Sequence, residues 1–173
     1  VLEKFKYKFM TSQRNTWMRH PYEFGKCTHV LLPNDEKLIE LSKCRSSLSF
    51  NMIYMSPNSK KNNFQAFEKF DDGIMPQLKA RTFEIASCKS LLIVKKDPWN
   101  LVEDFFEPEK EFIYFENFDE LDDIIYDVST NFEKYQGIIE AAYEKNKNYT
   151  VEKIYHYIKS DDKKLITWGN KHV

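Results

Sequence analysis

The sequence predicts an α/β fold in which helices flank a parallel β-sheet and a helical C-terminal cap completes it. Two observations predict this fold. From Cys27 onward, short apolar segments typical of strands alternate with segments of helical periodicity, which indicates βαβ units. One strand, Leu91–Lys95, begins with four consecutive apolar residues, the pattern of a parallel strand that is covered on both faces. We therefore expect this strand at the centre of the sheet.

The chain of 173 residues has the length of a single ordinary domain. We divide it into an irregular N-terminal connection (1–26), an α/β core (27–130), C-terminal helices (131–159) and a tail (160–173). Within the connection, apolar and basic residues alternate over residues 2–10, which favours an edge strand.

The first half of the core predicts a strand over 27–32 and a helix over 36–43. Asp35 is expected to cap this helix, whose inward-facing residues would be Leu38, Ile39 and Leu41. Apolar residues then alternate with polar ones over 46–55, which predicts a second strand. A polar loop over 56–63 and a short helix over 64–70 would lead to the central helix of the fold.

The central helix is expected to begin at Pro76, because proline is well tolerated at the first helical position. The N–H groups of Gln77, Leu78 and Lys79 would then point toward an anion. Lys79 and Arg81 lie in the first two turns, where the helix dipole disfavours each positive charge by a few tenths to about 1 kcal/mol. Two cations there indicate a diphosphate ligand, because each charged phosphate contact contributes roughly 1.5–3 kcal/mol.

The same cations have a simpler explanation, in which solvent surrounds them or they pair with Asp71, Asp72 and Glu84. Glu84 itself has two explanations. It lies three residues after Arg81 and therefore on the same side of the helix. Its carboxylate would either accept hydrogen bonds from ribose hydroxyls or form a surface pair with Arg81.

The second half of the core predicts a short helix that Asp97 opens and that ends at Phe105, followed by a turn over 107–110 and a strand over 112–115. The aromatic residues of this strand are expected in the core. Asn117 or Asp119 would cap the next helix, and two further amphipathic helices would cover 131–146 and 150–159.

The composition argues against several other classes of function. The formal net charge is −1, with Lys and Arg spread along the chain, which argues against nucleic acid as a partner. The cysteines Cys27, Cys44 and Cys88 show no disulfide or zinc spacing, which fits a reducing, cytoplasmic compartment. No apolar run approaches the roughly 18 residues of a membrane helix. The histidines lack metal-site spacing, and the chain has no Gly-rich phosphate loop, so we expect no metal ion and no cofactor.

Several segments together resemble the C-terminal region of the glycosyltransferase group 1 superfamily, and most closely its branch of spore-maturation glycosyltransferase-like proteins. There an arginine and a Phe-Glu pair lie on a helix, followed by an Ala-Cys-Gly step, a strand, a Phe-x-Pro-Gly-Lys-Glu turn, another strand and an Asp-Glu-Leu helix. The similarity spans about residues 46–158, and the segments that carry it run from Lys79 to Cys88, from Ser90 to Val94, from Glu103 to Glu111 and from Asn117 to Leu121.

The resemblance implies a Rossmann-like nucleotide-sugar donor domain, the C-terminal half of a two-domain GT-B enzyme that works without a bound metal and retains configuration. Glu84 matches the acid that holds the donor ribose, and Arg81 matches the cation that faces the diphosphate. Lys79 joins them by its position just upstream, and Thr82 is included among the residues expected to bind the donor. The sugar or glycan acceptor would bind an N-terminal domain that this chain largely lacks.

The sequence departs from the family pattern at two positions. Pro76 stands where related proteins have a first acid eight residues before Glu84, and Lys89 stands where the pattern has glycine. An alternative interpretation is therefore a degenerate GT-B-like module that is used for protein interaction, for which a closed pocket and a large exposed aromatic patch are expected. A receiver-like or flavodoxin-like domain fits the strand–helix alternation but not the paired cations.

Overall fold

The computed structural model describes residues 9–11, 28–30, 32–54, 74–150 and 153. The predicted polar loop, the short helix over 64–70, the tail and the acids Asp71 and Asp72 lie outside the described residues, as do nearly all of the N-terminal connection and of the helix over 150–159.

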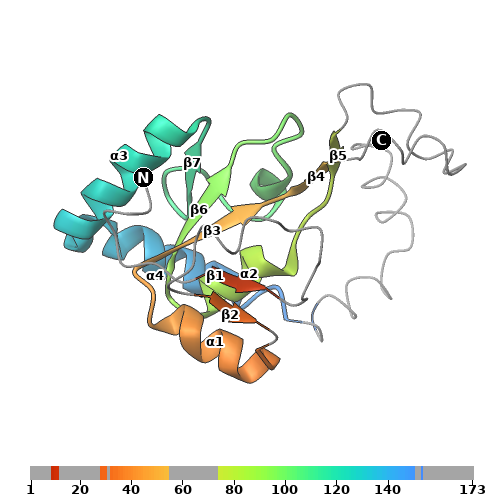
Figure 1. The fold of residues 1–173 in the computed structure, drawn as a ribbon, viewed down its shortest axis with the longest axis horizontal. Coiled ribbons are helices and arrows are strands. Elements are labelled where there is room, and N and C mark those ends of the chain that lie inside the picture. The colour runs from red at the N-terminus through yellow and green to blue at the C-terminus, as the bar shows by residue number, and fades with distance from the viewer. Residues whose placement is uncertain (1–8, 12–27, 31, 55–73, 151–152, 154–173) are drawn as a thin grey trace, which may run out of the picture.

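The elements alternate much as the sequence predicts (Figure 1). In chain order they are β1 (Phe9–Thr11), β2 (Thr28–Val30), α1 (Asn34–Ser42), β3 (Ser46–Phe50), β4 (Met52–Tyr54), β5 (Ile74–Pro76), α2 (Ala80–Ser87), β6 (Leu91–Lys95), the 3-10 helix η5 (Leu101–Asp104), β7 (Ile113–Phe115), α3 (Phe118–Thr130), the 3-10 helix η6 (Phe132–Tyr135) and α4 (Gln136–Asn146).

The core is a parallel sheet with the strand order β3-β6-β7, which confirms the α/β prediction. Ser46 lies opposite Leu91 in the register, and Ile93 lies opposite Ile113. The first four residues of β6 are fully buried, as expected of the central strand. Strands β1 and β2 form a separate parallel pair. Strand β2 lies within the strand predicted over 27–32, and β1 overlaps only the end of the edge strand predicted over 2–10, most of which lies outside the described residues.

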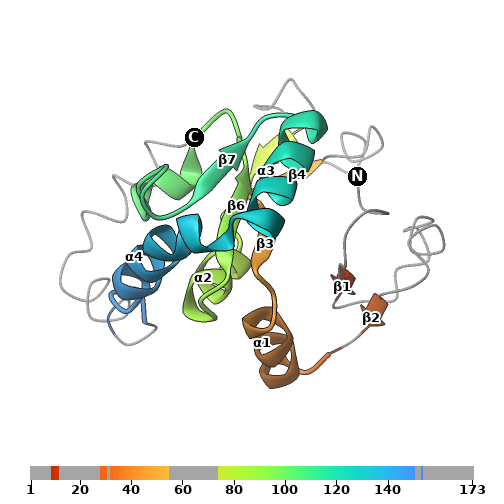
Figure 2. The ribbon, with the colours of Figure 1, turned by 90° about the vertical axis from the view of Figure 1, so that its left-hand side faces the viewer.

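Side chains of β6 alternate between two hydrophobic clusters because successive residues of a strand point to opposite faces. Leu92 and Val94 pack with residues of α1, α2, η5 and α4 and with the segment between η5 and β7, namely Leu41, Ile85, Ala86, Val102, Phe106, Phe112 and Ala142. Leu91 and Ile93 pack against a second cluster that contains Ile113, Phe115, Leu121, Val128, Tyr135 and Ile139. Helices α2 and α3 therefore cover opposite faces of the sheet (Figure 2).

Helix α1 differs from its prediction. It begins at Asn34 after Pro33, and no side chain caps it. Only Leu41 is buried, whereas Leu38 and Ile39 are 37% and 54% exposed. The expectation of three inward-facing residues was wrong because α1 packs at the periphery, where it meets the core mainly through α2 and buries only a narrow stripe of its surface.

The predicted strand over 46–55 is broken at Asn51. After this residue, β4 leaves the main sheet and pairs antiparallel with β5, so that Met52 lies opposite Pro76. Pro76 is therefore the last residue of β5, and the expectation that it begins the central helix was wrong. A proline fits an edge strand because it has no N–H to donate to a neighbour, and α2 begins four residues later at Ala80.

The predictions for the second half of the core hold more closely. The Oδ1 atom of Asn117 accepts a hydrogen bond from the N–H of Glu120 at 2.9 Å, and so caps α3 as one of the two predicted alternatives. Phe112 and Phe115 are buried, with 0% and 1% exposed. The predicted helix over 131–146 is present as η6 followed by α4.

Helix α2 ends with Lys89 in the left-handed conformation, with φ 52°. The N–H of Lys89 donates to the carbonyl of Ala86, and the N–H of Ser90 donates to the carbonyl of Ile85. These two bonds define a Schellman motif, whose left-handed position usually carries glycine because a side chain is strained there. The backbone thus keeps a turn suited to glycine, although lysine occupies it.

Two substitutions of Lys89 separate this strain from the contacts of the side chain. The ammonium lies 2.8 Å from the Glu140 carboxylate and 4.2 Å from the centroid of the Tyr143 ring, and Lys89→Ala and Lys89→Gly both remove these contacts. Only glycine relieves the strain, so we expect the glycine variant to be the more stable by about 1 kcal/mol in urea unfolding. Equal stability of the two variants would contradict the left-handed conformation.

Asp97 follows the central strand and is only 3% exposed. Its Oδ1 atom accepts hydrogen bonds from the N–H groups of Trp99 at 2.9 Å and Leu101 at 3.5 Å, whereas its Oδ2 atom is buried without a partner in the described part of the chain. Burial raises the pKa of the Asp97 carboxyl above its ordinary value of 3.8. The helix predicted from Asp97 is reduced to η5, because Asn100 has a positive φ of 52° and interrupts it.

The raised pKa predicts a pH dependence of stability. Because the folded pKa exceeds the unfolded value, the folded protein binds more protons, so the free energy of unfolding falls as the pH rises from about 4 through the raised pKa. Asp97→Asn keeps the acceptor for both N–H groups and removes this loss. We expect the stability of this variant relative to the parent to increase as the pH rises from 4 to 8, because only the parent carries the buried charge. Urea unfolding of both proteins from pH 4 to pH 8 tests this, and a constant difference across that range would contradict it.

Candidate functional site

The end of β3 meets the start of α2 at a buried cluster of three polar side chains. Ser49, Asn51 and Thr82 are each 0% exposed. The hydroxyls of Ser49 and Thr82 lie 2.8 Å apart, and the Thr82 hydroxyl lies 3.1 Å from Asn51 Oδ1. In open parallel sheets, ligands bind beyond the carboxyl ends of the strands, and this cluster lies where β3 ends.

Asn51 accepts hydrogen bonds from two of the three N–H groups that were expected to face an anion. Its backbone carbonyl accepts from Gln77 N–H, and its side-chain Oδ1 accepts from Lys79 N–H, both at 2.9 Å. Because α2 begins later than predicted, the N–H groups that remain free to bind an anion lie further along the chain than expected. Those of Ala80 and Arg81, in the first turn of α2, have no acceptor among the described residues.

Lys79 and Arg81 bring two positive charges to this helix end. Lys79 is the N-cap residue, with an extended backbone, and Arg81 is the second residue of α2. Both side chains are partly buried, and burial lowers the pKa of Lys79 below its ordinary value of 10.5. Within the part of the chain that the structure describes, no acid pairs with either cation. Pairing with Asp71 or Asp72 concerns residues outside that part.

Glu84 does not form the predicted alternative pair with Arg81. Its Oε1 atom instead lies 2.7 Å from the ammonium of Lys37, which α1 contributes. The side chains of Lys37 and Glu84 are 18% and 25% exposed, so the pair is largely shielded from solvent. No hydrogen bond to the other oxygen, Oε2, is found among the described residues, which leaves it able to accept donors.

Thr82 lies closer to the core than its sequence position indicated. Its side chain is fully buried, and its hydroxyl is already bound to Ser49 and Asn51. In this arrangement, Thr82 can influence a ligand only through the position of α2. Lys79 therefore lies directly before α2, Arg81 and Glu84 lie within it, and the buried side chain of Thr82 lies between the helix and the sheet.

Three residues of the site escaped the sequence analysis: Ser49, Asn51 and Lys37. Ser49 and Asn51 alternate with the apolar residues Phe50 and Met52, a pattern that normally indicates a solvent-facing side of a strand. The one available signal was asparagine inside a strand, where it is depleted. Lys37 lies 47 residues before Glu84, and no local pattern could link the two.

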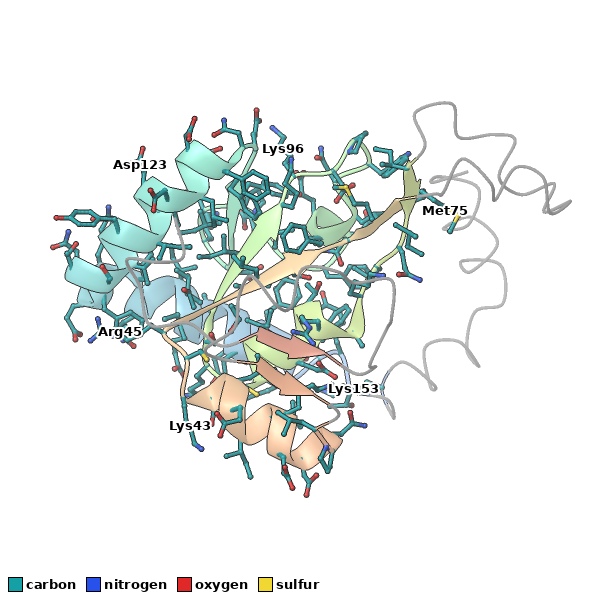
Figure 3. All side chains as sticks on the ribbon, viewed as in Figure 1. Lys43, Arg45, Met75, Lys96, Asp123 and Lys153 are labelled. Atoms are coloured by element: carbon teal, nitrogen blue, oxygen red, sulfur yellow. The ribbon has the colours of Figure 1, made fainter. Side chains whose placement is uncertain are left out.

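The site is confined to one end of β3. Arg45, just before this strand, and Met75, in β5, lie far apart at opposite ends of the β3–β5 region (Figure 3). Arg45 instead donates to the carbonyl of Ser129 in α3 at 2.8 Å. A substitution of Arg45 therefore changes the charge of the protein without touching the α2 N-terminus.

The described residues contain no group of three or more His, Cys, Asp or Glu residues that could hold a metal ion. No helix built from them is both long enough and apolar enough to cross a membrane. The thiol of Cys44 donates to the carbonyl of Glu40, and the thiol of Cys88 donates to the carbonyl of Leu38.

Comparison with known proteins identifies a family. A family model described as glycosyl transferase-like matches residues 16–160, which include the whole β3-β6-β7 sheet and the cationic end of α2. No curated protein and no solved structure matches the chain significantly. Because the matched segment covers most of the 173 residues, the chain belongs to the glycosyl transferase-like family.

Proposed function

We propose that the chain is the nucleotide-sugar-binding domain of a glycosyltransferase and that the N-terminus of α2 binds the diphosphate of the donor. The observation that carries this proposal is the pair of partly buried cations, Lys79 and Arg81, with no acid beside them among the described residues. A helix N-terminus disfavours positive charge, so the arrangement is stabilised once an anion binds.

The diphosphate would receive two kinds of contact. Arg81 presents a planar guanidinium that can bind phosphate oxygens in pairs, and Lys79 adds a compact charge. The N–H groups of Ala80 and Arg81 add donors along the helix dipole. These groups are in place before reaction, so they stabilise the negative charge that develops on the departing diphosphate.

Glu84 would bind the ribose of the donor. Lys37 holds one carboxylate oxygen, which fixes the side chain and leaves the other oxygen to accept ribose hydroxyls. Thr82 would not contact the donor but would hold α2 in position through its hydrogen bonds to Ser49 and Asn51.

The proposed reaction breaks the bond between the sugar and the diphosphate. The bonding electrons leave with the diphosphate, and an acceptor hydroxyl forms the new glycosidic bond and releases its proton. As in the family the sequence resembles, we place this domain in the C-terminal half of a GT-B enzyme of the spore-maturation branch, with retention of configuration and without a resident metal ion. The acceptor and any base would then belong to an N-terminal domain, and the enzyme would work in the cytoplasm.

The alternative of a non-catalytic interaction module lacks a comparable observation. Large hydrophobic side chains that are exposed in the described part belong to three separate elements: Leu38 and Ile39 of α1, Phe50 of β3, and Phe118 and Tyr126 of α3. Helices α1 and α3 lie far apart in both views of the ribbon (Figures 1 and 2). The exposed residues of α1 and those of α3 therefore do not form one patch.

Calorimetric titration with UDP-, GDP- and dTDP-sugars tests the proposed function. The parent protein should bind at least one donor saturably. Arg81→Gln should weaken both that donor and inorganic pyrophosphate by about 10- to 100-fold, the equivalent of one charged phosphate contact. Glu84→Gln should weaken the donor by about tenfold and leave pyrophosphate binding unchanged or slightly stronger, because pyrophosphate has no ribose.

Arg45→Gln is the matched control, since it removes one positive charge at the other end of β3. It should bind donor and pyrophosphate like the parent protein. Equal losses of affinity in Arg45→Gln and Arg81→Gln would mean that the net charge of the protein, and not a contact of Arg81, determines binding. The absence of saturable binding by all three donors would contradict the proposed function itself.

A further inference from the structure

We propose that Asn51 is a positioning residue that holds the cationic N-terminus of α2 in the conformation that binds phosphate. The inference rests on the proposed function and extends it to a residue outside the family pattern described above. Asn51 is 0% exposed and lies between the last residue of β3 and the first residue of β4. It acts on a ligand through α2.

Asn51 is attached to the same segment at three points. Its backbone carbonyl accepts from Gln77 N–H at 2.9 Å, and its Oδ1 accepts from Lys79 N–H at 2.9 Å and from the Thr82 hydroxyl at 3.1 Å. The segment from Gln77 to Thr82 contains both Lys79 and Arg81. The side chain of the N-cap residue Lys79 does not cap α2. Asn51 Oδ1 instead accepts from the N–H of Lys79 itself, the group that an N3 glutamate or glutamine binds in a capping box.

The direction of these hydrogen bonds is fixed by chemistry. A backbone N–H can only donate, so the atom of Asn51 that faces Lys79 must be the oxygen. The Thr82 hydroxyl donates to the same oxygen and must therefore accept from the hydroxyl of Ser49. The Asn51 Nδ2 atom is buried without a hydrogen-bond partner in the described part of the chain. The function of the Asn51 side chain in this cluster is therefore that of an acceptor.

These attachments determine how the two cations are presented. In a continuous helix, residues two positions apart point about 200° from each other, so Lys79 and Arg81 would lie on opposite sides. The structure avoids this because Lys79 has an extended backbone, with φ −95° and ψ 137°, and α2 begins only at Ala80. The bond from Lys79 N–H to Asn51 holds Lys79 outside the helix. Both cations can then serve one ligand.

The experiment measures binding and local backbone protection in the same variants. Asn51→Ala removes the side-chain acceptor, and Thr82→Val removes the hydroxyl while keeping the shape. Each should weaken pyrophosphate and donor binding by about tenfold at temperatures where the variant is fully folded. Thr82→Ser restores the hydroxyl and should bind like the parent protein. In Asn51→Ala, hydrogen exchange of the Lys79 amide should accelerate about tenfold or more relative to the amides of β6.

Ser47→Ala is the matched control, because Ser47 belongs to the same strand and its hydroxyl lies 2.9 Å from that of Ser90, near the other end of α2. It should leave binding unchanged. Parent-like affinity in both Asn51→Ala and Thr82→Val, or unchanged exchange at Lys79, would overturn the positioning role. If Asn51→Ala does not fold, the affinities of Thr82→Val and Thr82→Ser for pyrophosphate test the positioning role instead. A parent protein that binds neither pyrophosphate nor donor would refute the proposed function, while the exchange measurement would still test the attachments of Asn51.

Discussion

The candidate site depends on one set of hydrogen bonds, those that tie Asn51 to the segment between β5 and α2. They form where the chain leaves the parallel sheet, makes the β4–β5 pair and returns to begin α2. The hydrophobic clusters fix α2 against the sheet through Ile85 and Ala86, but apolar contacts are not directional. The hydrogen bonds of Asn51 determine the residue at which the helix begins, and hence the direction in which its first residues point.

The electrostatics of α2 follow from its packing against α1. Glu84 would be the natural partner of Arg81 within the helix, yet it pairs with Lys37 of α1. The negative charge of Glu84 is therefore neutralised by Lys37 from outside the helix, so Glu84 does not neutralise the positive charges of Lys79 and Arg81. The burial that lowers the pKa of Lys79 adds to this effect, because a cation shielded from water gains more from a bound anion. The proposed polyphosphate site thus depends on the packing between α1 and α2.

The sequence was sufficient for features that depend on local or strongly periodic patterns. The continuous apolar residues of β6 placed it at the centre of the sheet, and Asn117 was one of two predicted caps of α3. Features that depend on residues distant in the chain could not be predicted from the sequence. The alternation around Asn51 resembles a solvent-facing strand, whereas Thr82 and Lys79, 31 and 28 residues away, make it a buried junction. The same junction explains why Pro76 ends a strand and does not begin a helix.

The central claim is that the first turn of α2 binds the phosphates of the donor, and a titration of the isotope-labelled protein with pyrophosphate and UDP followed by NMR tests it most directly. We expect the largest, saturable shifts at the amides of Ala80, Arg81 and Thr82, with the Glu84 region responding to UDP but not to pyrophosphate. Shifts concentrated on α3 or at the other end of β3, with the first turn of α2 unaffected, would contradict the account.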